Sequence, residues 1–130
     1  MGWPFVVEIK VPWADIDGAG HVNNANYFSY FERARTEWYL ATRGGSRVEQ
    51  LDIILARTEC DFRSQASMGD VLRVLMWPGK VGQTSFGLRY EIRCGERLVA
   101  EGQSVQVAFD YEKNQKKPLP AEVRAALESA

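Results

Sequence analysis

The sequence is poor in the residues that metal centres, disulfide frameworks and nucleic-acid surfaces require. It has one histidine, His21, and two cysteines, Cys60 and Cys94, which form no Cys-x-x-Cys pair. No histidine lies beside either cysteine, so the spacing does not indicate a zinc site. Both cysteines lie in alternating apolar runs, which predicts buried free thiols in a reducing compartment. With 16 Lys and Arg against 17 Asp and Glu, the net charge of -1 does not favour a nucleic-acid partner.

Long hydrophobic runs are missing as well. No stretch approaches the length of a membrane span, and the apolar run from Trp3 to Val7 is interrupted by Pro4 and followed by Glu8. We therefore expect a soluble, cytoplasmic protein with no membrane partner. A chain of 130 residues that is 45% hydrophobic can bury a core of its own, so residues 1–130 are predicted to form a single domain.

The periodicity of the apolar residues predicts one long helix among several strands. Alternation over residues 5–11 predicts a first strand. An apolar stripe at helical spacing predicts a helix from Asn23 or Asn24 to about Thr42, with charged residues largely off the stripe. The stripe consists of Tyr27, Tyr30, Phe31, Ala34 and Trp38, and the charged residues are Glu32, Arg33, Arg35 and Glu37. Further strands and a short terminal helix are predicted over residues 53–62, 71–77, 86–94, 98–109 and 118–130.

This order of elements predicts an α+β fold. The economical arrangement is an antiparallel β-sheet wrapped around one long central helix, because one face of the sheet then buries the apolar stripe. Edge strands that are rich in apolar residues favour pairing with a second subunit.

The stretch from Asp17 to Tyr27 has the parts of an acyl-transfer or hydrolysis site. It places Asp17, a glycine-containing loop and His21 directly before the predicted helix. The start of a helix offers N–H groups without intrahelical partners and the positive end of the helix dipole. A carboxylate beside such a helix start can act on a carbonyl group while the N–H groups stabilise the oxyanion that forms.

Together with the order of elements, these residues resemble the hotdog fold, and more narrowly the 4-hydroxybenzoyl-CoA thioesterase-like branch of the acyl-CoA thioesterases. The matching residues are Asp15-Ile16-Asp17, Gly20, Asn26-Tyr27, the phrase from Tyr30 to Arg35, Met68-Gly69-Asp70-Val71-Leu72, and residues 82–85 and 118–120. The resemblance covers nearly the full length. It implies a homodimer, often paired into a homotetramer, with active sites at the subunit interface and no metal or organic cofactor.

The same resemblance implies roles for two residues. The catalytic carboxylate of the family maps to Asp17, and the oxyanion donor, a backbone N–H at the helix start, maps to Asn24. The phrase His21-Val22-Asn23-Asn24 is also similar to plant acyl-carrier-protein thioesterases, which use an Asp-x-Asn-x-His pattern. This chain has Ala19 where that pattern has its Asn. The role of His21 and the choice between CoA and a carrier protein therefore stay open.

Each candidate also has a structural interpretation. Asp17 either attacks the thioester carbonyl, takes a proton from water, or caps its own turn. His21 either polarises the carbonyl, orients Asp17 or braces the loop. Asn23 is a good helix cap. Glu32, a second carboxylate, is expected to form an ion pair on the helix with a neighbouring arginine such as Arg35.

The function expected from these residues is hydrolysis of an acyl-CoA thioester to a free acid and CoA. Catalytic roles are predicted for Asp17, Asn24 and His21. Arg63 is a candidate for the basic rim that the CoA phosphates require. The predicted substrate contacts are Gly20, Asn23, Tyr27, Arg63, Thr84 and Ser85. The alternatives are an acyl-carrier-protein thioesterase, a hotdog hydratase or dehydratase, and a non-catalytic acyl-thioester-binding protein.

Overall fold

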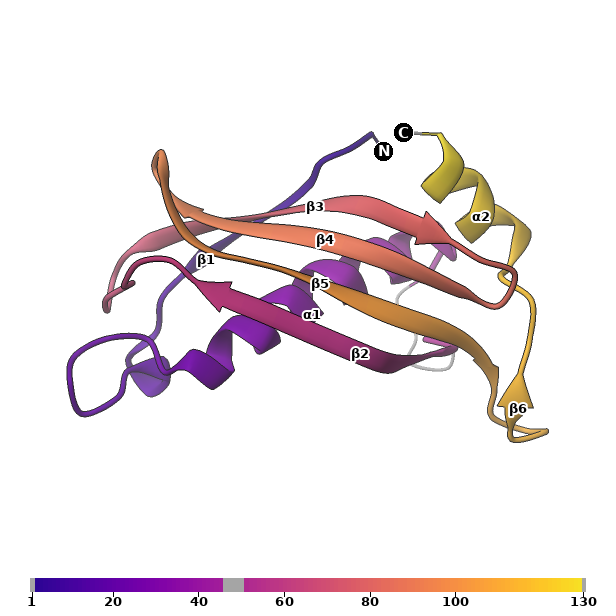
Figure 1. Ribbon diagram of the computed structural model, residues 1–130, viewed down its shortest axis with the longest axis horizontal. Coiled ribbons are helices and arrows are strands. Elements are labelled where there is room, and N and C mark those ends of the chain that lie inside the picture. Colours follow the sequence, from indigo (N-terminus) through magenta and orange to yellow (C-terminus); the bar gives the residue numbers. More distant parts are fainter. Residues whose placement is uncertain (1, 46–50, 130) are drawn as a thin grey trace.

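A computed structural model describes residues 2–45 and 51–129 of the chain. Its elements follow the predicted order (Figure 1). They are β1 (Phe5–Lys10), the 3-10 turn η1 (Trp13–Asp15), α1 (Asn24–Thr42), β2 (Ile53–Phe62), β3 (Val71–Val81), β4 (Ser85–Cys94), β5 (Arg97–Asp110), β6 (Gln115–Lys116) and α2 (Ala121–Glu128). The strand predicted over residues 71–77 is too short, because β3 continues past Pro78 through an irregular register.

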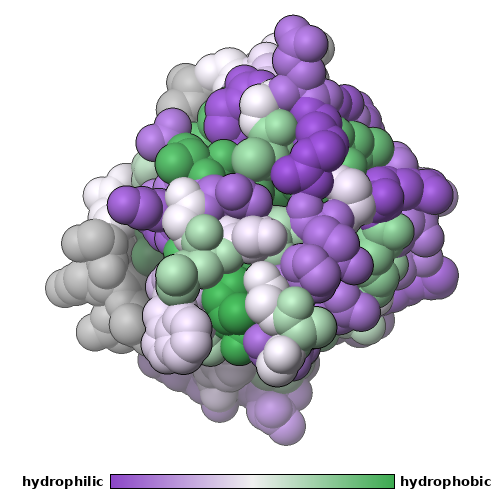
Figure 2. Space-filling model, turned by 90° about the vertical axis from the view of Figure 1, so that its left-hand side faces the viewer, coloured by the Kyte–Doolittle hydropathy of each residue, from purple (hydrophilic) through white to green (hydrophobic). Residues whose placement is uncertain are grey.

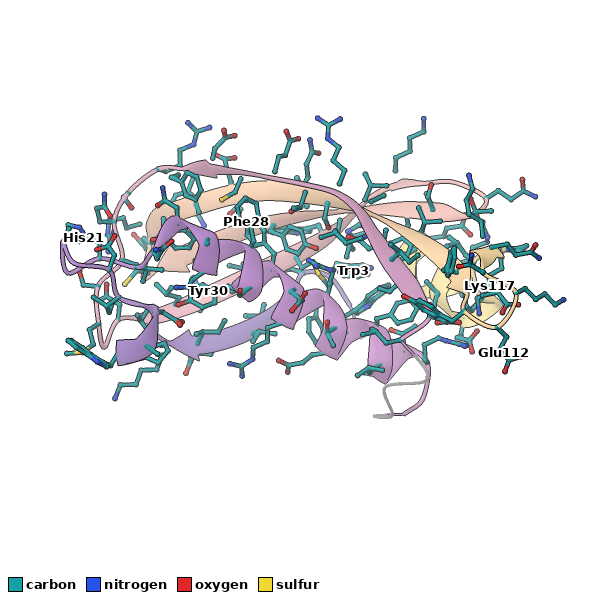
Figure 3. All side chains as sticks on the ribbon, turned by 90° about the horizontal axis from the view of Figure 1, so that it is seen from below. Trp3, His21, Phe28, Tyr30, Glu112 and Lys117 are labelled. Carbon is teal, nitrogen blue, oxygen red and sulfur yellow. The ribbon has the colours of Figure 1, made fainter. Side chains whose placement is uncertain are left out.

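The strands form one antiparallel sheet that wraps around α1. Their order is β1-β3-β4-β5-β2, and the short β6 pairs with β5. α1 lies along one face of this sheet (Figures 1 and 3). The predicted α+β hotdog architecture is therefore confirmed. The segment before β1 contacts α2 near the C-terminus, since Trp3 Nε1 donates a hydrogen bond to the Ala126 carbonyl at 3.1 Å.

α1 begins and ends where its sequence provides caps. The Asn23 side chain accepts a hydrogen bond from the Ala25 N–H at 3.0 Å, so the predicted capping role is confirmed. Gly44, at a φ of 77°, takes the left-handed conformation that ends the helix. The whole predicted apolar stripe is buried. Arg35, predicted to lie off the stripe, is buried as well, because it lies close to Tyr90 of β4.

The helix approaches the sheet closely at Gly102 of β5. The Phe31 ring stacks on Tyr90 at 4.3 Å between ring centroids, with 14° between the planes. A Cβ atom on Gly102 would lie 2.8 Å from the Phe31 Cε2 and 2.2 Å from the Glu59 carbonyl oxygen. This position therefore needs glycine so that α1 can dock against β5.

The inward face of β5 is partly polar. Ser104, Gln106 and Ala108 are buried, whereas the more hydrophobic Val105 and Val107 are only half-buried on the outer face. The Tyr90 hydroxyl lies 2.6 Å from the Ser104 hydroxyl, and Gln106 Nε2 donates to the Phe86 carbonyl at 3.1 Å. Ser104 in turn donates to the Gln106 side-chain oxygen. The buried polar groups thus satisfy one another, which makes their burial tolerable.

The two edge strands expose apolar residues. In β2, Ile54, Leu55 and Phe62 are 37%, 41% and 44% exposed, and in β1, Val6 is 47% exposed. The two cysteines are free thiols, as predicted, but they are half-buried rather than buried. For Cys60 the reason is its place in β2, which is an edge strand of the sheet that residues 2–45 and 51–129 form.

Candidate functional site

Asp17 sits in a tight loop that precedes α1. Its backbone N–H donates to the His21 carbonyl at 2.8 Å, and Gly20, at a φ of 84°, returns a hydrogen bond to the Asp17 carbonyl at 3.1 Å. The Asp17 Oδ1 accepts from the N–H groups of Ala19 at 2.9 Å and His21 at 3.3 Å. The carboxylate therefore caps its own turn, and this capping fixes its position. Among the described residues, Oδ2 takes part in no hydrogen bond.

Asp15 ties this loop to the helix, a role that the sequence reasoning missed. The Tyr30 hydroxyl donates to the Asp15 Oδ2 at 2.7 Å. The Asp15 carbonyl accepts from the Asn23 N–H at 2.9 Å and from the Asn26 side chain at 3.1 Å. Burial, followed by the bond to Asp15, raises the pKa of Tyr30, so its hydroxyl stays a donor at neutral pH. The single Asp-x-Asp pattern, Asp15-Ile16-Asp17, before a helix with inward tyrosines is the signal that could have indicated this anchor.

Asn24, the first residue of α1, offers a free backbone donor. Within residues 2–45 and 51–129, no acceptor bonds its N–H, as expected for a first-turn donor. A cavity of about 110 Å³ opens beside it. The cavity is lined by Asn24, Tyr27, Phe62, Arg63, Ser64 and Gln65. The long-range contact that builds it is a hydrogen bond from the Val22 N–H to the Ala66 carbonyl at 2.8 Å.

Tyr27 lines this cavity, and its hydroxyl is buried. Its side chain is 2% exposed, and among the described residues its hydroxyl has no hydrogen-bond partner of normal geometry. Burial raises the pKa of Tyr27, while a long hydrogen bond from the Ala66 backbone and the charge of Arg97 partly oppose this, and Cys60 and Asp17 add to the rise.

His21 belongs to the same loop but is joined to it through its backbone. It forms an isolated β-bridge with Ser67, and its half-buried imidazole makes no hydrogen bond to another described residue. His21 lies at the end of the molecule where α1 begins, together with Tyr30, and opposite Lys117 (Figure 3). On that end, apolar residues gather near the centre of the face among hydrophilic ones (Figure 2).

The remaining predicted contacts are divided between the two ends of the sheet. Arg63 lines the Asn24 cavity, but its Nε donates to Glu101 at 2.9 Å, so its charge is already paired. Thr84 and Ser85 belong to the turn from β3 into β4, which lies beside α2, at the other end of the sheet from the start of α1 (Figure 1). Arg124 of α2 donates a hydrogen bond to the Gly82 carbonyl of this turn at 2.7 Å. Glu32 is exposed and lies 3.7 Å from Arg35, the ion pair that the sequence predicted.

A second charged cluster occupies the end that lies far from Asp17. A cavity of about 690 Å³ there is bordered by Asp52, which accepts from the Tyr39 hydroxyl at 2.6 Å and from Arg43 at 3.1 Å, and also pairs with Lys117. Burial alone would raise the pKa of Asp52, but the bonds from Lys117 and Tyr39 and the charge of Arg43 hold it below its usual value. These contacts join α1 to the C-terminal segment, which is a structural role.

In the part of the chain that the structure describes, no group of three or more His, Cys, Asp or Glu side chains is arranged to hold a metal ion. No described helix is both long enough and apolar enough to span a bilayer.

The chain matches the family described as the thioesterase-like superfamily over residues 11–127. The 1,4-dihydroxy-2-naphthoyl-CoA hydrolase of a Synechococcus species is 29% identical over 129 residues, which are 92% of this chain and 87% of that protein. The acyl-CoA thioesterase YbgC of Helicobacter pylori is 31% identical over 85 residues, 65% of this chain and 64% of that protein. The chain is also similar to YsmA, an uncharacterised Bacillus subtilis protein, and spans 64% of it. It therefore covers slightly less than two thirds of YsmA and of YbgC. A Thermus thermophilus thioesterase, solved with coenzyme A and zinc, aligns with a TM-score of 0.87 at 27% identity over 98% of this chain and 94% of that one.

Proposed function

Because this chain belongs to the thioesterase-like superfamily, we propose that it is a thioester hydrolase, which cleaves an acyl-CoA thioester to a free acid and CoA. The observation that carries the proposal is that the held Asp17 carboxylate lies in the loop directly before α1, whose first residue, Asn24, has an unbonded backbone N–H. The names of two relatives, an acyl-CoA thioesterase and a naphthoyl-CoA hydrolase, support CoA as the thiol carrier.

In this proposal Asp17 supplies the reacting carboxylate oxygen. Its Oδ2 either attacks the thioester carbonyl carbon, giving a mixed anhydride that water then hydrolyses, or removes a proton from the water that attacks. In both routes the C–S bond breaks and CoA leaves as the thiolate. Negative charge develops on the carbonyl oxygen, where the Asn24 N–H and the positive end of the α1 dipole stabilise it. His21 borders the reacting groups from the same loop.

We further propose that the site is shared between two copies of the chain, in a homodimer or homotetramer in the cytoplasm. The exposed apolar side chains of the edge strand β2 support this assembly, since an open edge invites pairing. A second copy is also the source that would bring Thr84 and Ser85 near Asp17. Sedimentation of the purified protein is expected to give at least a dimer, and a monomer at micromolar concentration would contradict the shared site.

The replacement Asp17→Asn tests the proposal. An Asn side chain keeps the Oδ1 acceptor that Ala19 and His21 bond, so the loop should hold while the charge is lost. We expect free-thiol release from acyl-CoA to fall by about 10²–10⁴-fold, with the melting temperature and oligomer size unchanged. The substrate panel should include acyl-carrier-protein thioesters. A variant that keeps full activity would overturn the role of Asp17, and a wild-type protein that releases no thiol from any acyl-CoA would overturn the function.

A further inference from the structure

We propose that Arg35 is a specificity-determining residue, which binds a carboxylate at the far end of the acyl group. This inference rests on the proposed function and gives its substrate class, a CoA thioester of an acid that carries a second carboxylate. It starts from a buried charge. The Arg35 side chain is 7% exposed, and its acidic partner among the described residues is Glu32, which is 68% exposed and lies 3.7 Å away. This contact is too long for a hydrogen bond, whereas buried charges are ordinarily paired closely.

A cavity of about 320 Å³ lies beside Arg35, between α1 and β2. Its walls are largely apolar, and Arg35 supplies the positive charge; the lining residues are Glu32, Arg35, Thr36, Leu51, Ile53 and Leu55. A long hydrogen bond to the Tyr90 hydroxyl of β4 engages part of the guanidinium. A guanidinium carries several N–H donors in a planar fork, so the others can bind both oxygens of a carboxylate in the cavity.

Arg35 lies on the same face of α1 as Asn24, where the thioester carbonyl is proposed to bind. Phe28 and Phe31 stand between them at the spacing i, i+4, i+7 and i+11, which keeps all four residues on one stripe of the helix. A rise of about 1.5 Å per residue separates Asn24 from Arg35 by roughly 16 Å along the axis. The Arg35 side chain leans back toward the start of the helix and shortens this gap. One extended acyl group can therefore reach both residues.

Apolar side chains of α1 and β2 connect the two ends. The Phe28 ring is half-buried and contacts the Phe31 ring at 6.3 Å and the Phe62 ring of β2 at 6.5 Å between centroids. Phe62 also lines the cavity at the helix start, and Leu55 of the same strand lines the cavity beside the guanidinium. The same two elements thus border both cavities, and the side chains between them suit the methylene groups of an acyl chain.

The experiment measures thiol release by the full-length protein from substrate pairs that differ only at the chain end. Adipyl-, suberyl- and sebacyl-CoA are compared with hexanoyl-, octanoyl- and decanoyl-CoA, and ω-hydroxyoctanoyl-CoA tests a neutral polar end. We expect the wild type to prefer the carboxylate end by about 10–100-fold in kcat/KM at the best chain length. Arg35→Gln should abolish this preference. The preference is a ratio within one variant, so partial loss of folded protein does not change it.

Two exposed residues on the same helix provide a second variant and a control. Glu32→Gln removes the acid that competes for Arg35, so the preference for the carboxylate end should rise. Its exposed side chain makes this variant informative even where Arg35→Gln fails to fold. Arg33→Gln removes a cation that is 54% exposed and paired with Glu37 at 2.9 Å, and it should leave the preference unchanged.

Three results would overturn the role of Arg35. The wild type could hydrolyse neutral chains as well as dicarboxylic ones, or Glu32→Gln and Arg35→Gln could keep the wild-type preference. An equal preference for the hydroxyl end would mean that the cavity reads a hydrogen bond and not a charge. Failure of the proposed function itself looks different, because wild-type protein would then release no thiol from any acyl-CoA or Asp17→Asn would remain active.

Discussion

The close approach of α1 to the sheet makes a sharp prediction for Gly102→Ala. The added methyl group would lie 2.2 Å from the Glu59 carbonyl oxygen and 2.8 Å from the Phe31 ring. Neither neighbour can move freely, since one is backbone of β2 and the other is a fully buried ring stacked on Tyr90. Overpacking of this kind costs about 1–3 kcal/mol, and the backbone contact places this site near the upper limit. The smaller entropy of unfolded alanine offsets about 0.5–1 kcal/mol of that.

The expected net effect is a loss of about 2 kcal/mol in the free energy of unfolding, or roughly 6–10 °C in melting temperature for a chain of this size. Thermal and urea denaturation followed by circular dichroism measure it. Gly87→Ala in the adjacent strand β4 is the control, because its methyl group would meet only ordinary contacts at 3.4–3.6 Å. If the two variants are equally stable, the glycine at residue 102 is not what allows the helix to dock, and the reasoning fails.

Two further predictions concern charged and reactive groups. Asp52→Asn should lower the free energy of unfolding by about 2 kcal/mol at pH 7, because hydrogen bonds to a buried charged group are lost. The folded-state pKa of Asp52 is depressed, so its stabilisation is present above the unfolded pKa of about 3.9 and disappears as pH falls through the folded value. Wild type and variant should therefore converge in melting temperature in acid, and a gap that persists at pH 2 would contradict the assignment. Burial, with help from Asp61, raises the pKa of Cys60 to about 11, so alkylation at pH 8 should be about 100-fold slower than for free cysteine. Mass spectrometry after iodoacetamide treatment checks this, and labelling of Cys60 as fast as the free amino acid would refute it.

The local elements were predictable because their signals lie within a few residues of one another. The stripe from Tyr27 to Trp38 repeats at helical spacing, and Asn23 stands where a cap is needed, so α1 was predicted almost to the residue. The loop that carries Asp17 was likewise readable, since glycine and aspartate favour tight turns before a helix. These features depend on residues that are adjacent in the sequence, so the sequence alone predicts them.

The faces and partners of those elements were decided by tertiary structure. Ser104 and Gln106 are buried in place of Val105 and Val107 because the inward face of β5 is set by its register with β4 and β2, not by its own hydrophobicity. Arg35 is buried for a similar reason, since a charged residue beside the stripe is covered by the sheet.

In the candidate site, too, some contacts follow from the sequence and others only from the fold. The sequence determined that Asp17, Asn24 and Tyr27 lie close together, because they belong to one loop and the first turns of one helix. Only the fold brought Arg63 and Ala66 against them and placed Thr84 and Ser85 at the opposite end of the sheet. Contacts between distant segments depend on how strands pair and on how closely a helix can approach a sheet. No local pattern in the chain encodes the pairing or the separation.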